Sequence, residues 1–235
     1  MLKENVYINP SLCDASTHLK LVSFFLLFQD IANRNSDSLG VGKEKTTDVG
    51  WDWIITRVTV EFYRPVNLCE YVDLYTYPAG AKAGCIFTRN AGVRDKDGKL
   101  VVNLTSLWSV MDNKTRHIVM KPGFEAFNED LGEGLPMPER IPQEVTSFAF
   151  KRKIRYSDCD LNGHLNNTRY VEAIVDTNPL AFYMKHYVSK ITINFLNEVY
   201  DGDELEIYSN VDNTYIEGRV GDKVSFAAKL EYKAY

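Results

Sequence analysis

The chain contains two copies of one short motif, and this duplication constrains its architecture more than any other feature of the sequence. The first copy, CDASTHL, begins at Cys13, and the second, CDLNGHL, begins 146 residues later. The Cys-Asp pair, the His and the Leu occupy the same places in both. Ser16 and Thr17, however, stand in the first copy where the second has Asn162 and Gly163. The first copy therefore reads as a degenerate version of the second.

Two longer stretches repeat in the same order after the motifs. VTVEFYRPVNLCEYVDLY, from Val58, matches ITINFLNEVYDGDELEIY, from Ile191, at an offset of 133 residues and without a gap. DGKLVVNLTSLW and GDKVSFAAKLEY form a third, weaker pair. Repeats of this kind indicate two similar units in one chain. We predict units at 1–127 and 146–235, joined by a linker at 128–145 that is rich in Gly, Pro and acidic residues.

Each copy shows the same order of secondary-structure patterns. The motif leads into an apolar stretch typical of a buried helix, with Gly40 as the expected stop in the first copy. In the second copy we expect Asn166 or Asn167 to cap the helix and Pro179 to break it. Alternating strands follow, and Asp97-Gly98 predicts a hairpin turn. Strands that outnumber helices, around one buried helix per copy, predict an α+β fold.

Composition excludes several classes of protein. The net charge of −5 argues against general nucleic-acid binding, and no apolar run is long enough to cross a bilayer. The N-terminal residues show no secretory signal, so we expect a cytoplasmic protein. The four cysteines form no CxxC pair, so we expect neither a disulfide framework nor a metal site, and no cofactor.

The second motif carries residues that suit acyl hydrolysis. Asp160 can accept a proton from water, Asn162 can orient that water or a substrate carbonyl, and His164 can donate or accept a hydrogen bond. If a helix begins just after Gly163, the backbone N–H groups of Gly163 and His164 are candidates to stabilise an oxyanion. A structural alternative stays open, because Asp and Asn also cap helices.

The pattern D-x-N-x-H-x-N-N-x-x-Y, from Asp160 to Tyr170, resembles the acyl-acyl-carrier-protein (acyl-ACP) thioesterases of plant plastids and bacteria. The duplication and the place of the motif in the second copy agree with this resemblance, which covers nearly the whole chain. The resemblance implies two tandem hotdog domains, each a long helix wrapped by an antiparallel sheet. The first domain would shape the acyl-chain side, and the second would hold the catalytic motif.

The resemblance also implies a catalytic set of Asp160, Asn162 and His164, with a Glu about one strand downstream that falls on Glu198. The first copy has Pro65 at the place of that Glu. Val199 follows Glu198, so no cysteine is available there as a nucleophile. We therefore expect attack by water, with Asp160 and Glu198 sharing the role of base.

The implied substrate is the acyl-phosphopantetheine arm of acyl carrier protein, an acidic partner that needs a local basic surface. The run KRKIR leads to the motif and supplies the docking candidates, which are Lys151, Arg152, Lys153 and Arg155. An ordinary strand with exposed charges is the alternative. The acyl chain needs an apolar tunnel, for which aromatic residues of the first copy are candidates, although they could equally form plain core: Phe24, Phe28, Trp51 and Trp53.

Rival functions stay open at this point. An acyl-CoA thioesterase of the same fold would use the same chemistry on a different carrier. A hotdog hydratase would also use an acid and a His. A non-catalytic acyl-binding protein would need none of the four polar residues. The pattern also leaves a homodimer open.

Overall fold

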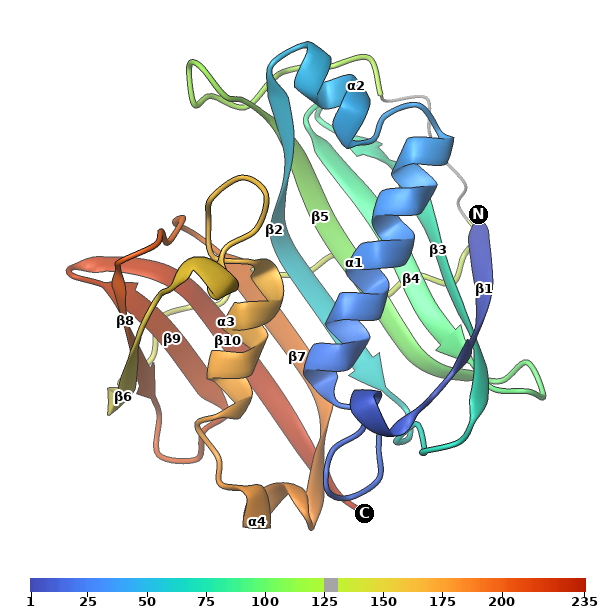
Figure 1. Ribbon diagram of the computed structural model, residues 1–235, viewed down its shortest axis with the longest axis vertical. Helices are drawn as coiled ribbons and strands as arrows, with labels where there is room; N and C mark the ends of the chain where they lie inside the picture. Colours follow the sequence, from blue (N-terminus) through green and yellow to red (C-terminus); the bar gives the residue numbers. More distant parts are fainter. Residues whose placement is uncertain (125–130) are drawn as a thin grey trace.

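The computed structural model describes residues 1–124 and 131–235 of the chain. Its centre is one ten-stranded antiparallel sheet with the order β1-β3-β4-β5-β2-β7-β10-β9-β8-β6 (Figure 1). The strands of the first half are β1 (Leu2–Tyr7), β2 (Trp51–Phe62), β3 (Tyr71–Lys82), β4 (Ile86–Arg94) and β5 (Leu100–Asp112). Those of the second half are β6 (Ser147–Lys153), β7 (His186–Phe195), β8 (Glu204–Ser209), β9 (Tyr215–Val220) and β10 (Lys223–Ala234). The predicted α+β class is confirmed.

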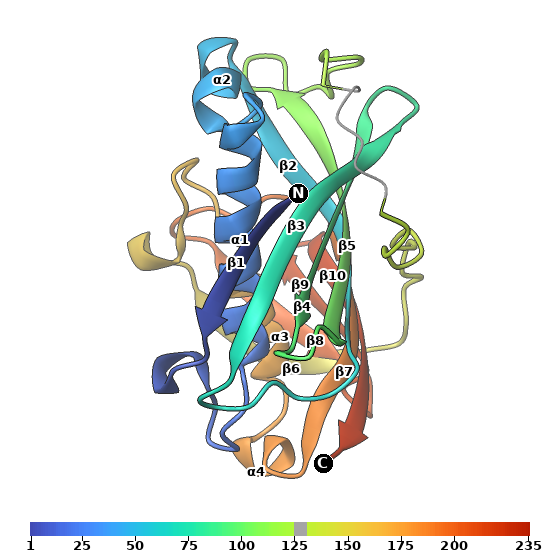
Figure 2. The same cartoon turned by 90° about the vertical axis from the view of Figure 1, so that its right-hand side faces the viewer.

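The helices lie together on one face of this sheet (Figure 2). The α-helices are α1 (Leu21–Ser38), α2 (Lys43–Asp48), α3 (Asn167–Val175) and α4 (Leu180–Tyr183), and two short 3-10 turns are η1 (Pro10–Leu12) and η2 (Tyr156–Asp158). Phe24, Phe28 and Ile31 of α1 are almost fully buried. Burial of such a side chain stabilises the fold by about 1.5–3 kcal/mol each, so the packing of α1 on the sheet accounts for much of the first half's core.

The two halves of the sheet have the same strand order. Five strands run β1-β3-β4-β5-β2 in the first half and β6-β8-β9-β10-β7 in the second. The halves meet where β2 pairs with β7, and Thr59 lies opposite Thr192 in that pairing. These two residues also occupy equivalent places in the sequence repeat. Each half thus packs five strands against a central helix, as in a hotdog domain, and the two halves share a single continuous sheet. The helix is long in the first half, where α1 has 18 residues, and shorter than expected in the second, where α3 has 9. The boundaries of the two units, at 127 and 146, stay a prediction.

The helices differ from the expectation in one respect that matters for the site. Gly40, with φ of 70°, follows the end of α1, and Asn166 caps α3 by accepting the N–H of Thr168. Both features agree with the sequence. The prediction that a helix begins just after Gly163 is wrong, because α3 begins at Asn167. The residues from Asp160 to Asn166 form a loop, in which the Asp160 carboxylate accepts backbone N–H groups.

Residues 131–146, the described part of the segment that joins the halves, run along the face of the sheet away from the helices (Figure 2). Side chains of the central strands hold its backbone. Asn103 donates to the Glu133 carbonyl over 2.7 Å, and Asn194 both donates to the Glu139 carbonyl and accepts from the Ile141 N–H, each over 3.0 Å. Of the predicted linker at 128–145, positions 128–130 lie outside the described residues. The remainder covers a polar sheet surface and ties the two halves together.

Candidate active site

The second motif forms a tight turn around one carboxylate. Asp160 Oδ1 accepts the backbone N–H of Asn162 over 2.8 Å and that of His164 over 3.4 Å. The Asp160 N–H donates to the His164 carbonyl over 2.8 Å. Gly163 closes the turn with φ of 76°, in the left-handed region that favours glycine. The acid, the amide and the imidazole are therefore held on one short, closely bonded loop.

The first motif folds into the same turn, but its side chains have different partners. The Asp14 N–H donates to the His18 carbonyl over 2.9 Å, and Thr17 adopts the left-handed φ of 66° that its glycine counterpart adopts. Ser16 Oγ donates to Asp14 over 2.7 Å. The ring of Tyr235 stacks on the His18 ring at 4.6 Å between centroids. The motif correspondence predicted from sequence is thus visible in the backbone, while the side chains differ.

Glu198 lies beside His164 and is held as an anion. His164 Nδ1 is 3.4 Å from Glu198 Oε1, and the Tyr200 hydroxyl donates to Glu198 Oε2 over 2.8 Å. Arg116, from the turn that follows β5 in the first half, forms an ion pair with the same carboxylate. Burial alone would raise the pKa of Glu198, but the Tyr200 hydroxyl and the Arg116 guanidinium outweigh burial and hold the pKa below its usual range. Glu198 is therefore suited to orient His164 and poorly suited to take up a proton.

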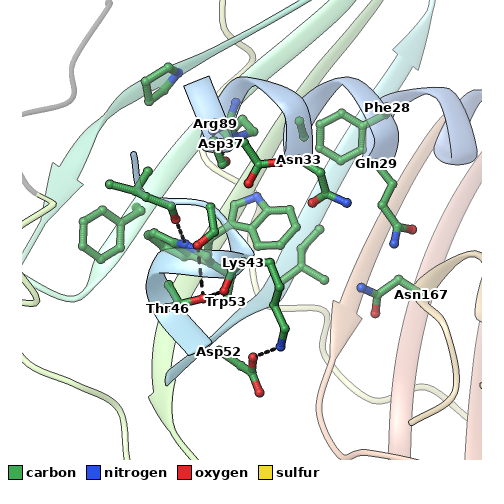
Figure 3. Close-up of a pocket in the computed structure, with 18 of the residues that line it drawn as sticks. Phe28, Gln29, Asn33, Asp37, Lys43, Thr46, Asp52, Trp53, Arg89 and Asn167 are labelled. Atoms are coloured by element: carbon green, nitrogen blue, oxygen red, sulfur yellow. Dashed lines mark hydrogen bonds and ion pairs between the residues drawn. The ribbon is translucent and has the colours of Figure 1, made fainter. Parts of the chain in front are cut away.

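Asn162 also contacts a cation of the first half. Lys43, the first residue of α2, donates from Nζ to Asn162 Oδ1 over 2.7 Å. The same ammonium forms an ion pair with Asp52 near the start of β2. Figure 3 shows Lys43 and Asp52 pointing toward one another, with Asn167 of α3 on the same side of the cavity.

A cavity of about 430 Å³ connects the motif to the interior of the first half. It lies between α1 and the sheet (Figure 3) and is lined on that side by Phe25, Phe28, Ala32, Trp53, Ile55, Phe87 and Trp108. Its other end is polar and is formed by Lys43, Asp52, Asp160, Asn162, Asn167 and Thr168. Polar side chains also line the cavity along α1 and β4, among them Asn33, Asp37 and Arg89 (Figure 3). The apolar stretch beside the polar end at the motif suits an apolar chain that carries one reactive polar group.

A second, more open depression lies on the outer side of the motif. Its lining consists of Tyr156, Ser157, Cys159, Asp160, Leu161, Gly163 and Asp201. Asp160 and Leu161 line both this depression and the inner cavity. Asp160 therefore stands where a ligand passing from the surface into the cavity would cross the motif.

The backbone groups predicted to stabilise an oxyanion are engaged within the turn. The Gly163 N–H donates to the Asp160 carbonyl over 3.0 Å, and the His164 N–H points at the Asp160 carboxylate. The first turn of α3 lines the cavity instead, through Asn167 and Thr168. At the first position of a helix the N–H has no intrahelical acceptor, so the N-terminus of α3 offers the positive end that the sequence placed at Gly163.

The aromatic candidates for the acyl tunnel fall into two groups. Phe28 and Trp53 line the cavity, and Trp53 also donates from its ring N–H to the Val41 carbonyl over 2.7 Å. Phe24 is fully buried against Phe62, and Trp51 packs against Phe124, and neither is among the cavity-lining residues.

The basic residues of the predicted docking run also differ in their surroundings. Lys151 pairs with Glu204 across the edge of the sheet at 2.8 Å. Arg152 pairs with the buried Asp158 at 2.6 Å, so its charge belongs to the support of the motif loop. Lys153 and Arg155 are exposed and lead directly into Tyr156, at the rim of the outer depression.

The thiol of Cys159 is unsuited to nucleophilic attack. Burial and the nearby carboxylate of Asp201 raise the pKa of the Cys159 thiol, which disfavours the reactive thiolate. Within the described ranges, no group of three or more His, Cys, Asp or Glu side chains is arranged to hold a metal ion. None of the helices in this part of the chain is long and apolar enough to span a membrane.

Comparison with known proteins finds one family along most of the chain. A family model described as the acyl-ACP thioesterase N-terminal domain matches residues 2–122, and one for the C-terminal domain of the same family matches residues 143–231. The dodecanoyl-[acyl-carrier-protein] hydrolase of Cinnamomum camphora is 28% identical over 159 residues, which cover 62% of this chain and 41% of that protein. The palmitoyl-acyl carrier protein thioesterase of Gossypium hirsutum is 24% identical over 180 residues, which cover 72% of this chain and 43% of that protein. The chain thus spans less than half the length of these curated relatives.

Solved structures show the same fold. A crystal structure of an acyl-ACP thioesterase from Bacteroides thetaiotaomicron superposes with a TM-score of 0.91, at 23% identity, covering 98% of this chain and 97% of that one. The 12:0-ACP thioesterase from Umbellularia californica superposes with a TM-score of 0.85, at 19% identity, covering 100% of this chain and 97% of that one. The tandem hotdog architecture is therefore established along the whole described chain.

Proposed function

The chain belongs to the acyl-ACP thioesterase family, and on that premise we propose that it hydrolyses the thioester of acyl-acyl carrier protein and releases a free fatty acid. The observation that carries this proposal is the position of Asp160, which lines both the apolar cavity and the outer depression. The acyl chain would occupy the cavity and the phosphopantetheine arm would occupy the depression. The thioester then lies at the motif.

Asp160 is the proposed general base. It lines the cavity, whereas Glu198 is not among the residues that line it and is tied to Arg116, Tyr200 and His164. The lowered pKa of Glu198 also makes it a weak proton acceptor near neutral pH. The sequence suggested that the two acids share the role of base. We propose instead that Asp160 is the base and that Glu198 orients His164.

The proposed reaction needs only water and these side chains. Asp160 accepts a proton from water while the water oxygen bonds to the carbonyl carbon, and the carbonyl oxygen becomes an oxyanion. The Asn162 amide and the N-terminus of α3 lie at the same end of the cavity and are positioned to stabilise that charge. When the intermediate collapses, the carbon–sulfur bond breaks, and the pantetheine thiolate takes up the proton held by Asp160. The raised pKa of Cys159 supports attack by water over attack by a cysteine.

Release of free thiol from acyl-ACP and from acyl-CoA of the same chain length tests the proposed function and its main alternative. We expect a higher kcat/KM on the carrier-protein substrate. Equal or better kcat/KM on acyl-CoA would favour the acyl-CoA thioesterase. Absence of thiol release from both substrates would favour a non-catalytic acyl-binding protein.

The docking surface is best tested with two residues of the KRKIR run. Replacing Arg152 would also disturb Asp158, so the clean substitutions are Lys153→Glu and Arg155→Glu. Because long-range attraction to an acidic partner is screened by salt, the double variant should raise KM for acyl-ACP and weaken its salt dependence, with kcat little changed. The same KM and salt dependence as wild type would remove these residues from the docking surface. A cytoplasmic location and a homodimer stay predictions, and the named plant relatives are described as chloroplastic.

A further inference from the structure

Lys43 and Asn162 form a contact between the two repeats that the motif alone does not contain. The Lys43 Nζ lies 2.7 Å from Asn162 Oδ1, although 119 residues separate them along the chain. Both residues line the cavity. A charged lysine head group carries only hydrogen-bond donors, so the atom of the Asn162 amide that faces it has to be the oxygen. This contact therefore determines which way the amide is turned.

The orientation of the amide decides what Asn162 can do. With its oxygen toward Lys43, the NH₂ end faces away from the cation and is free to donate. The Lys43 ammonium next to the amide oxygen also polarises the amide group, and this strengthens its N–H groups as donors. The NH₂ group of an amide held in this way can donate to an oxyanion. Its oxygen is already engaged by Lys43, so it is less able to accept a hydrogen bond from the attacking water.

The first repeat holds Lys43 in place by two features. Asp52, on the adjacent strand β2, pairs with the ammonium, and its side chain is 16% exposed against 45% for Lys43. Gly42, directly before Lys43, is buried against Asp37, and an added Cβ would lie 2.9 Å from the Asp37 backbone Cα. A side chain at this position would require the backbone to shift, so glycine permits the close turn that brings the first residue of α2 to the motif of the other repeat.

We propose that Lys43 is a positioning residue that orients Asn162 as an oxyanion donor, so that the active site is complete only with a cation from the degenerate repeat. This inference rests on the proposed thioesterase function. The second repeat supplies the acid, the amide and the imidazole, and the first supplies both the acyl cavity and the charge that turns the amide. The contact also gives the degenerate repeat an indirect part in the chemistry, through the orientation of Asn162.

The kinetic test is a double-mutant cycle on acyl-ACP hydrolysis. Loss of an oxyanion donor lowers kcat by about a hundredfold or more, so the kcat of Asn162→Ala should fall by that factor. Lys43→Met should lower kcat by about tenfold, the scale seen when a supporting partner of a site residue is removed, with KM unchanged. In the Asn162→Ala background, Lys43→Met should have no further effect. Lys43→Arg keeps a donor and should recover part of the loss. Lys45→Met, two residues along the same helix and exposed, is the matched control and should behave as wild type.

Three kinetic results would overturn the inference. The first is an unchanged kcat in Lys43→Met. The second is an increase in KM alone, which would instead indicate that Lys43 binds the phosphate of the phosphopantetheine arm. The third is a double variant in which the two losses of kcat multiply. Melting curves of every variant separate unfolding from lost catalysis.

A second readout separates this inference from the proposed function. The side-chain NH₂ resonances of Asn162, identified by their loss in Asn162→Ala, should shift in Lys43→Met and not in Lys45→Met, without any substrate present. If wild type hydrolyses no thioester but these resonances shift as expected, the proposed function fails while the contact stands. If wild type is active and the resonances do not move, the positioning role fails.

Discussion

The Thr59 hydroxyl lies 2.9 Å from the Thr192 hydroxyl, and these are equivalent residues of the two repeats. The pair sits where β2 and β7 run antiparallel, with Arg57 opposite Asn194 on one side and Glu61 opposite Lys190 on the other. The duplication is therefore built as a two-fold arrangement around this pair. His18 bridges to Asn67 after β2, and His164 bridges to Tyr200 after β7, so the two motifs lie at opposite ends of this central strand pair. The side chains around each motif make the two ends unequal.

We expect Cys159→Ser to keep most of the wild-type kcat. The raised pKa of the Cys159 thiol leaves little thiolate near neutral pH, and Cys159 Sγ is occupied by a weak hydrogen bond to the Arg155 carbonyl at 3.7 Å. Thiol release under saturating acyl-ACP measures the effect. An acyl group trapped on Cys159, detected by mass spectrometry, would contradict the water mechanism.

The ion pair between Arg116 and Glu198 should contribute stability that depends on pH. Because the pKa of Glu198 is lowered in the folded state, its contribution is present above the unfolded-state pKa and is lost as pH falls through the folded-state pKa. Arg116→Met should raise the pKa of Glu198 and lower the free energy of unfolding near neutral pH. Since the pair is partly exposed, the expected loss is about 1 kcal/mol or less.

Urea unfolding of wild type and Arg116→Met at neutral pH and in acid checks this prediction. The difference between the two proteins should vanish below both pKa values. Lys114→Met, in the same exposed turn, is the control. An equal difference at both pH values would mean that Arg116 acts through packing and not through the Glu198 charge.

The linker should depend on Asn194 for its attachment to the sheet. Asn194 is 4% exposed and satisfies two backbone groups of the linker, the Glu139 carbonyl and the Ile141 N–H. Asn194→Ala should lower the free energy of unfolding by about 1–3 kcal/mol, because a buried polar site loses both bonds. A urea unfolding curve with an unchanged slope and a lower midpoint would show this. An unchanged midpoint would show that the linker is held by its other contacts alone.

The acyl cavity should set the preferred chain length. Its lining on β4 and β3, which includes Thr88 and Pro78, lies across the sheet from the motif beyond β5 and β2. Pro78 lies opposite Arg89, whose side chain bonds α1, so Pro78 is on the face of the sheet that the cavity shares. Pro78→Trp should fill this far end and move the preference toward shorter acyl chains, while hydrolysis of the shortest substrates stays near wild type. Rates across a series of acyl-ACP chain lengths measure the profile. An unmoved profile would place the end of the acyl chain elsewhere.

The α+β fold and its two-fold repetition could be predicted because they depend on local sequence patterns. The alternating strands and the end of the first helix at Gly40, for example, are determined by residues close together in the chain. The start of α3 could not be predicted in the same way. An Asn-rich stretch offers several caps, and the choice of Asn166 depends on the loop that Asp160 closes upstream.

The sequence placed all the polar candidates for catalysis in the second repeat. Asp160, Asn162 and His164 stand together in the sequence, whereas Lys43 and Arg116 reach the same place from the other repeat. Neither cation belongs to a repeated pattern, and only the pairing of β2 with β7 brings them near. Exposed lysines and arginines are common, so no sequence signal separates these two from the rest. Phe24 shows the converse limit, since an aromatic residue on a buried helix face has the same pattern whether it lines a cavity or fills the core.

The most direct test of a single active site compares Asp160→Asn with Asp14→Asn in acyl-ACP hydrolysis, with melting curves recorded alongside. Both substitutions remove one carboxylate from the same backbone turn, so their structural effects should be similar. Asp160→Asn should lower kcat by about a hundredfold or more, the scale of a lost general base, while Asp14→Asn keeps kcat near wild type. Equal losses of activity in two well-folded variants would contradict the account, because both turns would then take part in catalysis.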